Sequence, residues 1–337
     1  MTDYIQSLRE KVGHDLLLVT SVAIVVFDDQ GRVLLARHNE GDVWVLPGGG
    51  IEPPESPADA AVREMWEETG LWIEPVRVIG VYGGPDFLVT YANGDQVAYQ
   101  TIVFAGRVIE GAPRPDAREI KAVGYFSETA WAALPTPRWM QVVMPDVFRR
   151  SAQTCFQKSR WQPPVDGVRK GGMSDYVRQL RGKVGNSLVL TPSVWGLVFD
   201  EQRHLLLQKR ADNGRWAGPA GAIDPEDSPT DAVVREAWEE TGVLVEPVRV
   251  LAVFGGAAYA HTFSDGDQII NYGIIFECKF VSGRPTPDGI EAMDVNFFPL
   301  PSLPRQAMSA RWQKFIAGAT PERAETDFEP PTWRPPQ

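Results

Sequence analysis

The feature that most constrains the fold of this chain is an internal duplication of its sequence. "MTDYIQSLREKVG" at residue 1 reappears as "MSDYVRQLRGKVG" at residue 173. Residues 1–84 align with residues 173–256 without a gap, and about half of the positions are identical. The period is far longer than that of a solenoid repeat, so we expect each copy to fold as a domain.

The likeness between the copies returns at their ends. "FQKSRWQPP" (156–164) resembles "FEPPTWRPP" (328–336), and we expect the tryptophans of these tails, Trp161 and Trp333, to cap each domain. The short Gly-containing stretch "VDGVRKGG" between the copies is typical of a linker. We therefore predict a first domain at residues 1–164, a linker at 165–172 and a second domain at 173–337.

Composition and charge limit the possible environments and partners. The formal net charge of −11 disfavours a nucleic-acid polymer as partner, although a divalent metal can still bring in a small phosphorylated substrate. The two cysteines, Cys155 and Cys278, have no metal-ligand spacing, which favours a reducing cytoplasm. The apolar runs 16–27 and 188–199 are too short to span a bilayer, so we predict buried strands and no membrane partner.

Each copy has the pattern of a mixed α and β fold. In the first copy, a helix is predicted over residues 3–13 and a hairpin turn at Asn93-Gly94. Strands are predicted over residues 22–27, 32–37, 76–82, 100–108 and 123–126, and the second copy repeats the pattern, with its last strand at 295–298.

A second helix is predicted within "GGGIEPPESPADAAVREMWEETGL", residues 48–71. Ser56 is a favoured N-cap residue and Pro57 suits the first helical position, while Gly70 ends the helix after Thr69. We therefore place this segment as a loop, one helix and a second loop, set between strands of a sheet. The second copy has the same signals at Ser228, Pro229 and Gly242.

Three glutamates share one face of this helix in each copy, namely Glu64, Glu67 and Glu68, and Glu236, Glu239 and Glu240. A solvated acidic face is the simple alternative, because like charges one turn apart cost only about 0.2–0.5 kcal/mol per pair. Three features favour a functional site instead: the glycine-rich loop before the helix, Arg63 one turn before Glu67, and the repetition of the whole arrangement. Clustered carboxylates suit a hard divalent cation that also bridges substrate phosphates.

Residues 49–71 resemble the Nudix box, G-x5-E-x7-R-E-U-x-E-E-x-G-U, at every specified position: Gly49, Glu55, Arg63, Glu64, Met65, Glu67, Glu68, Gly70 and Leu71. The resemblance covers both copies and hence nearly the whole chain. It implies tandem Nudix folds of the α+β class, each an α/β/α sandwich with a mixed sheet between helices and a loop-helix-loop box.

The second box, residues 221–243, is slightly degenerate. Asp227 stands where the box has glutamate, and Ala220, Ala222 and Ala237 also depart from the pattern. Asp227 is one methylene shorter than glutamate, so its reach to Arg235 is expected to be altered. The remaining positions match: Gly221, Arg235, Glu236, Glu239, Glu240, Gly242 and Val243.

The resemblance implies a hydrolase, a Mg²⁺- or Mn²⁺-dependent pyrophosphohydrolase that cleaves the diphosphate of nucleoside diphosphate derivatives by attack of water at phosphorus. ADP-ribose, other sugar nucleotides, modified nucleoside triphosphates and dinucleoside polyphosphates all satisfy the box.

The implied metal ligands are Glu64, Glu67, Glu68 and Gly48 in the first copy and Glu236, Glu239 and Glu240 in the second. Arg63 and Arg235 join the first two acids of each copy as catalytic residues, and the structural residues of the two boxes are Gly49, Glu55, Gly70, Gly221, Asp227 and Gly242.

Other residues have two interpretations each. Glu64 and Glu67 are candidate general bases; Glu119 and its counterpart Glu291 are alternatives, or else plain surface acids. Candidate substrate-binding residues are Arg37, Lys209, Arg210, Trp44 and Trp216, of which the tryptophans equally suit packing beside a strand. His38 is a solvated loop residue or a phosphate ligand.

Several assignments for the whole chain stay open. A catalytic first domain with a non-catalytic, nucleotide-binding second domain is the alternative to two active sites. A nucleotide sensor without catalysis is a further possibility, disfavoured because both copies keep the acids, and diphosphate isomerisation is disfavoured because the cysteines lie far from the boxes. The short linker and matching ends suggest an intramolecular pseudo-dimer.

Overall fold

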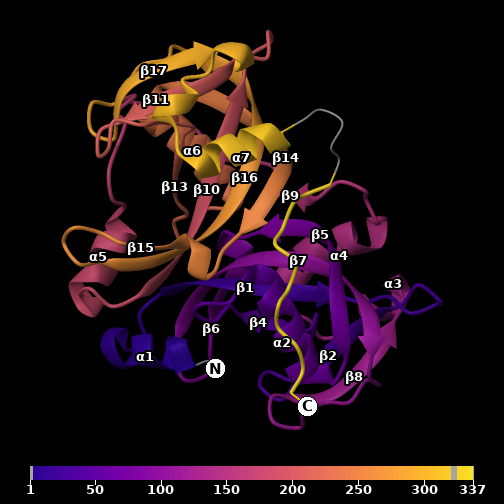
Figure 1. Cartoon of the computed structure of the whole chain (residues 1–337). Helices are drawn as coiled ribbons and strands as arrows, with labels where there is room; N and C mark the ends of the chain where they lie inside the picture. Colours follow the sequence, from indigo (N-terminus) through magenta and orange to yellow (C-terminus); the bar gives the residue numbers. More distant parts are fainter. Residues whose placement is uncertain (1–2, 320–324, 337) are drawn as a thin grey trace.

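The computed structural model describes residues 3–319 and 325–336, and each copy of the repeat forms its own lobe (Figure 1). The helices of the first copy are α1 (Asp3–Val12), α2 (Pro57–Thr69), α3 (Glu128–Trp131) and α4 (Arg138–Arg149). Its strands are β1 (Leu17–Val25), β2 (Val33–His38), β3 (Trp44–Val45), β4 (Gly48–Gly50), β5 (Trp72–Tyr82), β6 (Leu88–Thr90), β7 (Gln96–Glu110), β8 (Ile120–Phe126) and β9 (Cys155–Phe156).

The second copy repeats the order of the main elements, without an α-helix equivalent to the short helix α3 or a strand equivalent to the short strand β9 among the described residues. Its helices are α5 (Asp175–Val184), α6 (Pro229–Thr241) and α7 (Ala310–Gly318). Its strands are β10 (Val189–Phe199), β11 (Leu205–Arg210), β12 (Trp216–Ala217), β13 (Ala220–Ala222), β14 (Val243–Phe254), β15 (Ala260–Thr262), β16 (Gln268–Gly283) and β17 (Ala292–Phe298).

The sheets are mixed, as expected for the predicted fold class. In the first copy, β1 runs parallel to β7, and β7 runs antiparallel to β5, while β2 pairs with β3 and β8 in a smaller sheet. In the second copy, β10 runs parallel to β16, which is antiparallel to β14. The two copies therefore share one strand arrangement.

Alternation along the central strand puts helices on both faces of the sheet. In β1, Val22 and Ile24 lie in the same apolar cluster as Met65 of α2. The intervening Ala23 and Val25 belong to a different cluster, which contains four buried residues of α4: Met140, Val143, Met144 and Val147. The second copy uses α6 and α7 in the same way. This confirms an α/β/α sandwich.

The box helix has the bounds that its local signals predict. Ser56 accepts a hydrogen bond from the backbone N–H of Asp59, and the Asp59 carboxylate reaches back to Ser56 in a capping box. Gly70 ends α2 in the left-handed conformation at φ 67°, where a side chain would be strained. Ser228, Asp231 and Gly242 have the same roles around α6.

Some elements differ from the sequence-based expectations. The predicted turn at Asn93-Gly94 is present, but it joins β7 to the three-residue strand β6. Helix α4 was not expected: it contains Pro145, and its N-cap position is Pro137, which makes no side-chain cap. Its amphipathic packing outweighs these weak local signals.

The tails of the two copies cross over instead of capping their own lobes. In the first tail, Trp161 lies 5.6 Å from Trp238 of α6, measured between ring centroids. In the second tail, the backbone N–H of Trp333 donates to Asp59 of α2, 2.7 Å away. Figure 1 shows this C-terminal segment, in yellow, running over the first lobe.

Buried contacts also join the lobes at their N-terminal helices. Tyr4 of α1 accepts a hydrogen bond from the N–H of Leu190, 2.8 Å away, and Tyr176 of α5 accepts one from the N–H of Leu18, 2.7 Å away. A single apolar cluster contains buried residues of both lobes. The lobes therefore touch through reciprocal contacts.

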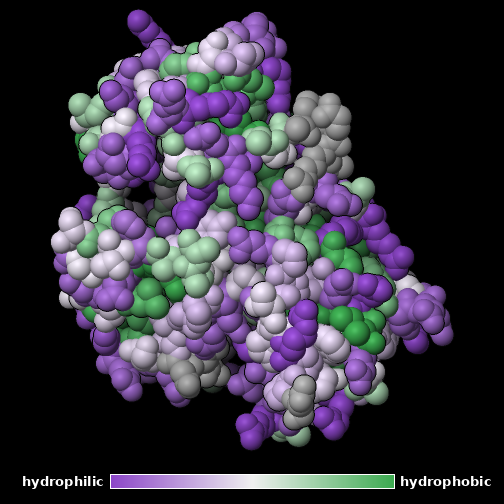
Figure 2. Space-filling model, viewed as in Figure 1, coloured by the Kyte–Doolittle hydropathy of each residue, from purple (hydrophilic) through white to green (hydrophobic). Residues whose placement is uncertain are grey.

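The surface is mainly polar on the face drawn in Figure 2, where hydrophilic residues surround smaller hydrophobic patches. Within the described ranges, no helix is long and apolar enough to cross a bilayer.

Candidate active site

Helix α2 presents its acids to β4, the short glycine strand Gly48–Gly50, which together with the turn after it is called the glycine loop below. The side chains of Glu64 and Glu68 are buried, whereas Glu67 is exposed. One carboxylate oxygen of Glu68 accepts the backbone N–H of Gly48 at 3.0 Å. A Cβ at Gly49 would stand 2.6 Å from Oε1 of Glu64, so only glycine leaves room for this carboxylate.

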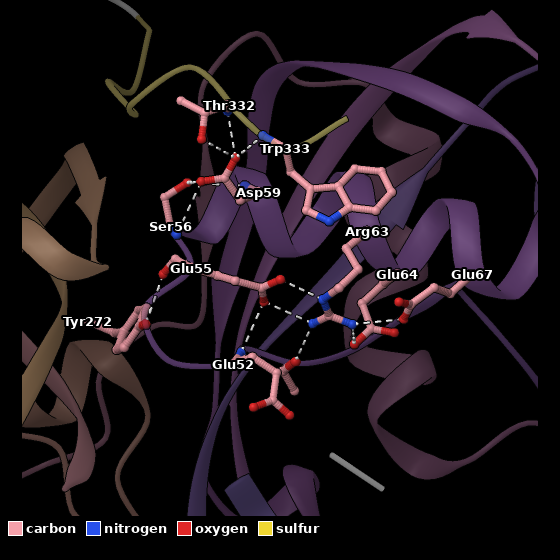
Figure 3. A network of polar contacts seen from close by, with 11 residues as sticks. Glu52, Glu55, Ser56, Asp59, Arg63, Glu64, Glu67, Tyr272, Thr332 and Trp333 are labelled. Carbon is pink, nitrogen blue, oxygen red and sulfur yellow. Dashed lines mark hydrogen bonds and ion pairs between the residues drawn. The ribbon is translucent and has the colours of Figure 1, made fainter. Parts of the chain in front are cut away.

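Arg63 joins three acids of the first box, Glu55, Glu64 and Glu67, into one network (Figure 3). Its Nε and one terminal nitrogen donate to the Glu55 carboxylate at 2.6 and 3.0 Å. The other terminal nitrogen donates to Glu64 at 2.8 Å and to Glu67 at 3.0 Å. A further bond to the carbonyl of Gly50, 3.0 Å long, ties the same guanidinium to the loop. Arg63 thus fixes the positions of Glu64 and Glu67.

Burial changes the acidity of the two inner carboxyl groups. It raises the pKa of Glu64 to about 7, although Arg63 opposes the shift. Burial also raises the pKa of Glu68 well above its usual range, and the neighbouring carboxylates of Glu64 and Glu119 raise it further. Ionisation of both carboxyl groups is therefore unfavourable in this pocket unless a cation compensates their charge.

The second box repeats the network, with the shorter side chain of Asp227 in place of Glu55. Arg235 donates from Nε to Asp227 at 2.9 Å, and a terminal nitrogen donates to Glu236 at 2.7 Å and to Glu239 at 3.2 Å. Asp224 lies 3.9 Å from Arg235 as an additional acidic neighbour. The shorter side chain thus keeps its bond to the arginine, and the acids remain in place.

The inner acids of the second box are buried like those of the first. Glu240 accepts the N–H of Ala220 at 2.8 Å, the counterpart of the bond from Gly48 to Glu68. Burial raises the pKa of Glu236 to about 7 and that of Glu240 well above its usual range.

The donor set of each box fits a hard divalent cation. In the described part of the chain, no three His, Cys, Asp or Glu side chains are already gathered as a metal-ligand cluster. Two buried carboxylates nevertheless meet at a glycine loop that a Cβ would fill. Among the contacts of the described residues, Arg63 neutralises Glu64 and Glu67, whereas Glu68 bonds to the backbone of Gly48. Carboxylate oxygens with uncompensated charge are ligands that Mg²⁺ and Mn²⁺ prefer.

The structure places the side chain of His38 at the first box, whereas the sequence left its role open between a solvated loop residue and a phosphate ligand. Nε2 of His38 lies 3.9 Å from Oε1 of Glu68, and burial lowers the pKa of the imidazole. The adjacent Arg37 pairs with Asp42 at 2.8 Å and lies over the ring of Trp44, 5.9 Å from its centroid. His38 therefore lies at the acids, whereas Arg37 is held by an acid outside the box.

The second lobe contains a cavity of about 760 Å³ beside its box. Arg210, the counterpart of His38, lines it and is held by Asp212 through two bonds of 2.9 Å. Lys209 is exposed on the opposite face of β11. Glu291 also lines the cavity and accepts the N–H of Gly172 at 3.1 Å. The structure therefore brings Arg210 and Glu291, but not Lys209, to this cavity.

The two tryptophans before the boxes pack against aromatic neighbours. Trp44 lies edge-on to Phe126, with ring centroids 4.7 Å apart, and Trp216 lies edge-on to Phe298 at 4.9 Å. Trp216 also lines the cavity of the second lobe. Packing accounts for Trp44, whereas Trp216 has both a packing contact and a face toward the cavity.

A family model for the NUDIX domain matches residues 17–147 and 189–318, which together make up most of the chain. The chain belongs to the Nudix family. The two matched regions confirm a tandem arrangement of Nudix domains, each containing one of the boxes described above.

Two curated relatives of this Nudix protein are a MutT-like protein of Streptomyces ambofaciens, 45% identical over 62 residues, and an RNA pyrophosphohydrolase of Saccharophagus degradans, 49% identical over 65 residues. The matches cover 18% and 19% of this chain and 40% and 38% of those proteins, so the chain spans well under half of their length. An ADP-ribose pyrophosphatase structure from Streptococcus suis is 22% identical, covering 40% of this chain and 96% of that one with a TM-score of 0.33.

Sequence reasoning missed part of the wall of the cavity beside the second box. Trp312 of α7 stacks on Trp195 of β10 with ring centroids 4.9 Å apart, and both line the cavity. Gly218 makes room for them, because a Cβ there would stand 2.7 Å from the Trp312 ring. The first copy has Ala23 and Leu46 in place of Trp195 and Gly218. An alignment of the two copies shows both replacements, so a comparison of the repeats could have indicated this part of the cavity wall.

Proposed function

We propose that this protein is a divalent-metal-dependent pyrophosphohydrolase that cleaves the diphosphate linkage of nucleoside diphosphate derivatives. The observation that carries the proposal is the buried pair of carboxylates in each box, Glu64 with Glu68 and Glu236 with Glu240. In each pair an arginine holds the first acid, and a backbone N–H of the preceding loop donates to the second. Membership of the Nudix family supports this class of reaction.

Each residue of the first box has a distinct role in the proposed reaction. Glu64, Glu67 and Glu68, with the carbonyl of Gly48, hold the metal ion, and Arg63 with Glu55 keeps the acids in position. A bound Mg²⁺ or Mn²⁺ supplies charge neutralisation for the diphosphate and polarises the attacking water. Glu236, Glu239 and Glu240, with Arg235 and Asp227, act equivalently in the second box.

The proposed step is a displacement at phosphorus. The oxygen of a water molecule forms a bond to one phosphorus, and the bridging P–O bond of the anhydride breaks. A sugar nucleotide then gives two phosphate monoesters, a nucleoside triphosphate gives a monophosphate and pyrophosphate, and a dinucleoside polyphosphate gives two nucleotides. The proton of the water goes to a carboxylate of the box or to a neighbouring acid. Glu64 and Glu67 are the candidates within the first box, and Glu119 and Glu291 are the candidates outside the boxes.

Basic side chains near the acids provide contacts to the substrate phosphates. Arg210 lines the second cavity, and His38 lies beside Glu68 in the first lobe. Because these counterparts differ in charge and shape, we propose that the two sites prefer different nucleotides.

A second candidate function assigns catalysis to the first site and nucleotide binding to the second. It is favoured by Asp227, whose carboxylate makes one hydrogen bond to Arg235 where Glu55 makes two to Arg63, counted over the residues described. The variants Glu67→Gln and Glu239→Gln, made separately, distinguish the two candidates. If the Glu239→Gln variant keeps every activity of the wild type, the second site is not catalytic.

We further propose that residues 1–164 and 173–337 are domains that pair as an intramolecular pseudo-dimer in the cytoplasm. The reciprocal bonds of Tyr4 and Tyr176 and the crossing tails support the pairing. The free thiols of Cys155 and Cys278 support a reducing compartment. Sedimentation that shows independently tumbling domains would contradict the pairing.

The test of the proposed function is a substrate panel with Mg²⁺ and with Mn²⁺. It contains ADP-ribose, other sugar nucleotides, modified nucleoside triphosphates and dinucleoside polyphosphates, and the products are identified by mass. We expect two phosphorylated products from at least one compound, and none when a chelator is added. Absence of cleavage across the panel would contradict the proposal.

A further inference from the structure

One side chain of the second lobe reaches into the box of the first. Tyr272 of β16 donates its hydroxyl to the backbone carbonyl of Glu55, with an O–O distance of 2.8 Å (Figure 3). Only 1% of the Tyr272 surface is exposed, so water cannot replace this donor. The loop that contains Glu55 is therefore held by the other lobe.

The equivalent position of the first lobe makes the same contact in the opposite direction. Gln100 of β7 precedes Tyr272 by one repeat length, and its Nε2 donates to the backbone carbonyl of Asp227 at 2.9 Å. Gln100 is buried as well. Two chemically different side chains thus donate to equivalent backbone carbonyls, one in each box. The contact is therefore common to both copies, although the residue type is not.

Glycines allow the lobes to approach closely at this point. Gly256 has a φ of 95°, and a Cβ there would stand 3.0 Å from the carbonyls of Pro54 and Glu55. The next residue, Ala257, donates its N–H to the carbonyl of Pro54 at 3.1 Å. In the first lobe, Gly84 lies against Ser228 in the same manner. Backbone contact therefore accompanies the side-chain bond on both sides of the interface.

The contact reaches the metal-facing acids through two steps. The carbonyl of Glu55 is fixed by Tyr272, and the carboxylate of the same residue holds Arg63 at 2.6 and 3.0 Å. Arg63 in turn holds Glu64 and Glu67. A shift of the Glu55 loop would move the guanidinium, and with it the carboxylates that it orients.

We propose that Tyr272 is a positioning residue of the first active site and Gln100 is a positioning residue of the second, so that each site is completed by the other lobe. The inference rests on the proposed function, because the acids it acts on are the proposed metal ligands. It makes the two domains dependent on each other in activity as well as in stability.

The test uses Tyr272→Phe, which removes the hydroxyl and keeps the ring, in a Glu239→Gln background that disables the second site. We expect kcat at the first site to fall about tenfold, as for other residues that orient metal ligands, with KM changed less than about twofold. Calorimetric titration with Mn²⁺ in the absence of substrate should show weaker binding by a similar factor.

Thr326→Val in the same background is the matched control, because it removes a different buried hydroxyl that crosses the interface, bonded to Thr154 at 2.7 Å. It should leave kcat and Mn²⁺ affinity unchanged. The inference is wrong if Tyr272→Phe matches this control in both quantities.

If the Glu239→Gln parent cleaves nothing on the panel, catalysis by the first site is contradicted. The Mn²⁺ affinity still decides in that case whether Tyr272 positions the acids. If Tyr272→Phe does not fold, Gln100→Leu in a Glu67→Gln background gives the same Mn²⁺ comparison at the second site.

Discussion

The guanidinium of Arg63 holds the carboxylate of Glu55 through two nitrogens, at 2.6 and 3.0 Å. Glu55 also holds two of the proposed metal ligands in place through this arginine, since Arg63 contacts Glu64 and Glu67 at its other end. Two parallel bonds fix the orientation of a planar guanidinium better than one bond does. The first box is therefore braced more firmly than the second, where Asp227 bonds to Nε of Arg235.

Exchanging the two acids tests this difference between the boxes. We expect Glu55→Asp to lower kcat at the first site several-fold, because the shorter carboxylate loses one of the two bonds. Asp227→Glu should raise kcat at the second site by a similar factor. Each variant is measured with the other site disabled by Glu239→Gln or Glu67→Gln. Unchanged kcat in both exchanges would show that the brace does not limit catalysis.

Gly49→Ala tests whether the glycine loop is shaped by the adjacent acid. The added Cβ would stand 2.6 Å from Oε1 of Glu64, so the carboxylate must move away from the loop. We expect at least a tenfold loss of kcat with little change in the unfolding midpoint. Gly182→Ala in α5 is the matched control, because a Cβ there meets no atom within 4 Å. It should keep full activity and gain slight stability from helix propensity. Equal activity of the two variants would contradict the proposed geometry.

The box could be predicted from the sequence because its signals are local. Ser56 and Gly70 set the helix bounds within a few residues of the positions they determine, and the spacing of the acids follows from the helical repeat. The crossing of Trp333 onto Asp59 could not be predicted, because the two residues are separated by most of the chain. Helix α4 was missed for another reason: its buried side chains, not its caps, stabilise it.

The tail contact predicts a pH dependence of stability. Burial alone would raise the pKa of Asp59, but hydrogen bonds from the N–H groups of Trp333 and Thr332 and from Ser56 outweigh burial and hold the pKa below its usual range. A group with a depressed folded-state pKa stabilises the fold above its unfolded value, about 3.9, and this stabilisation is lost as the pH falls through the folded value.

Asp59→Asn should therefore lower stability by about 1–2 kcal/mol at pH 7. The difference from the wild type should shrink below about pH 4, where the wild-type carboxyl group becomes protonated. Asp231→Asn, at the equivalent contact with the first tail, is expected to behave alike, since its pKa is lowered by the same kinds of bonds. Unfolding curves at several pH values measure both. A difference that stays constant down to pH 2 would contradict this account of the tails.

The central claim is that the buried acids of the boxes bind a divalent cation, and calorimetric titration with Mn²⁺ tests it most directly. The wild-type protein should take up Mn²⁺, and the double variant Glu64→Gln with Glu236→Gln should bind it at least about tenfold more weakly, because each box loses a carboxylate ligand. Absence of uptake by the wild type, with and without a nucleotide, or equal affinity of the double variant, would contradict the claim.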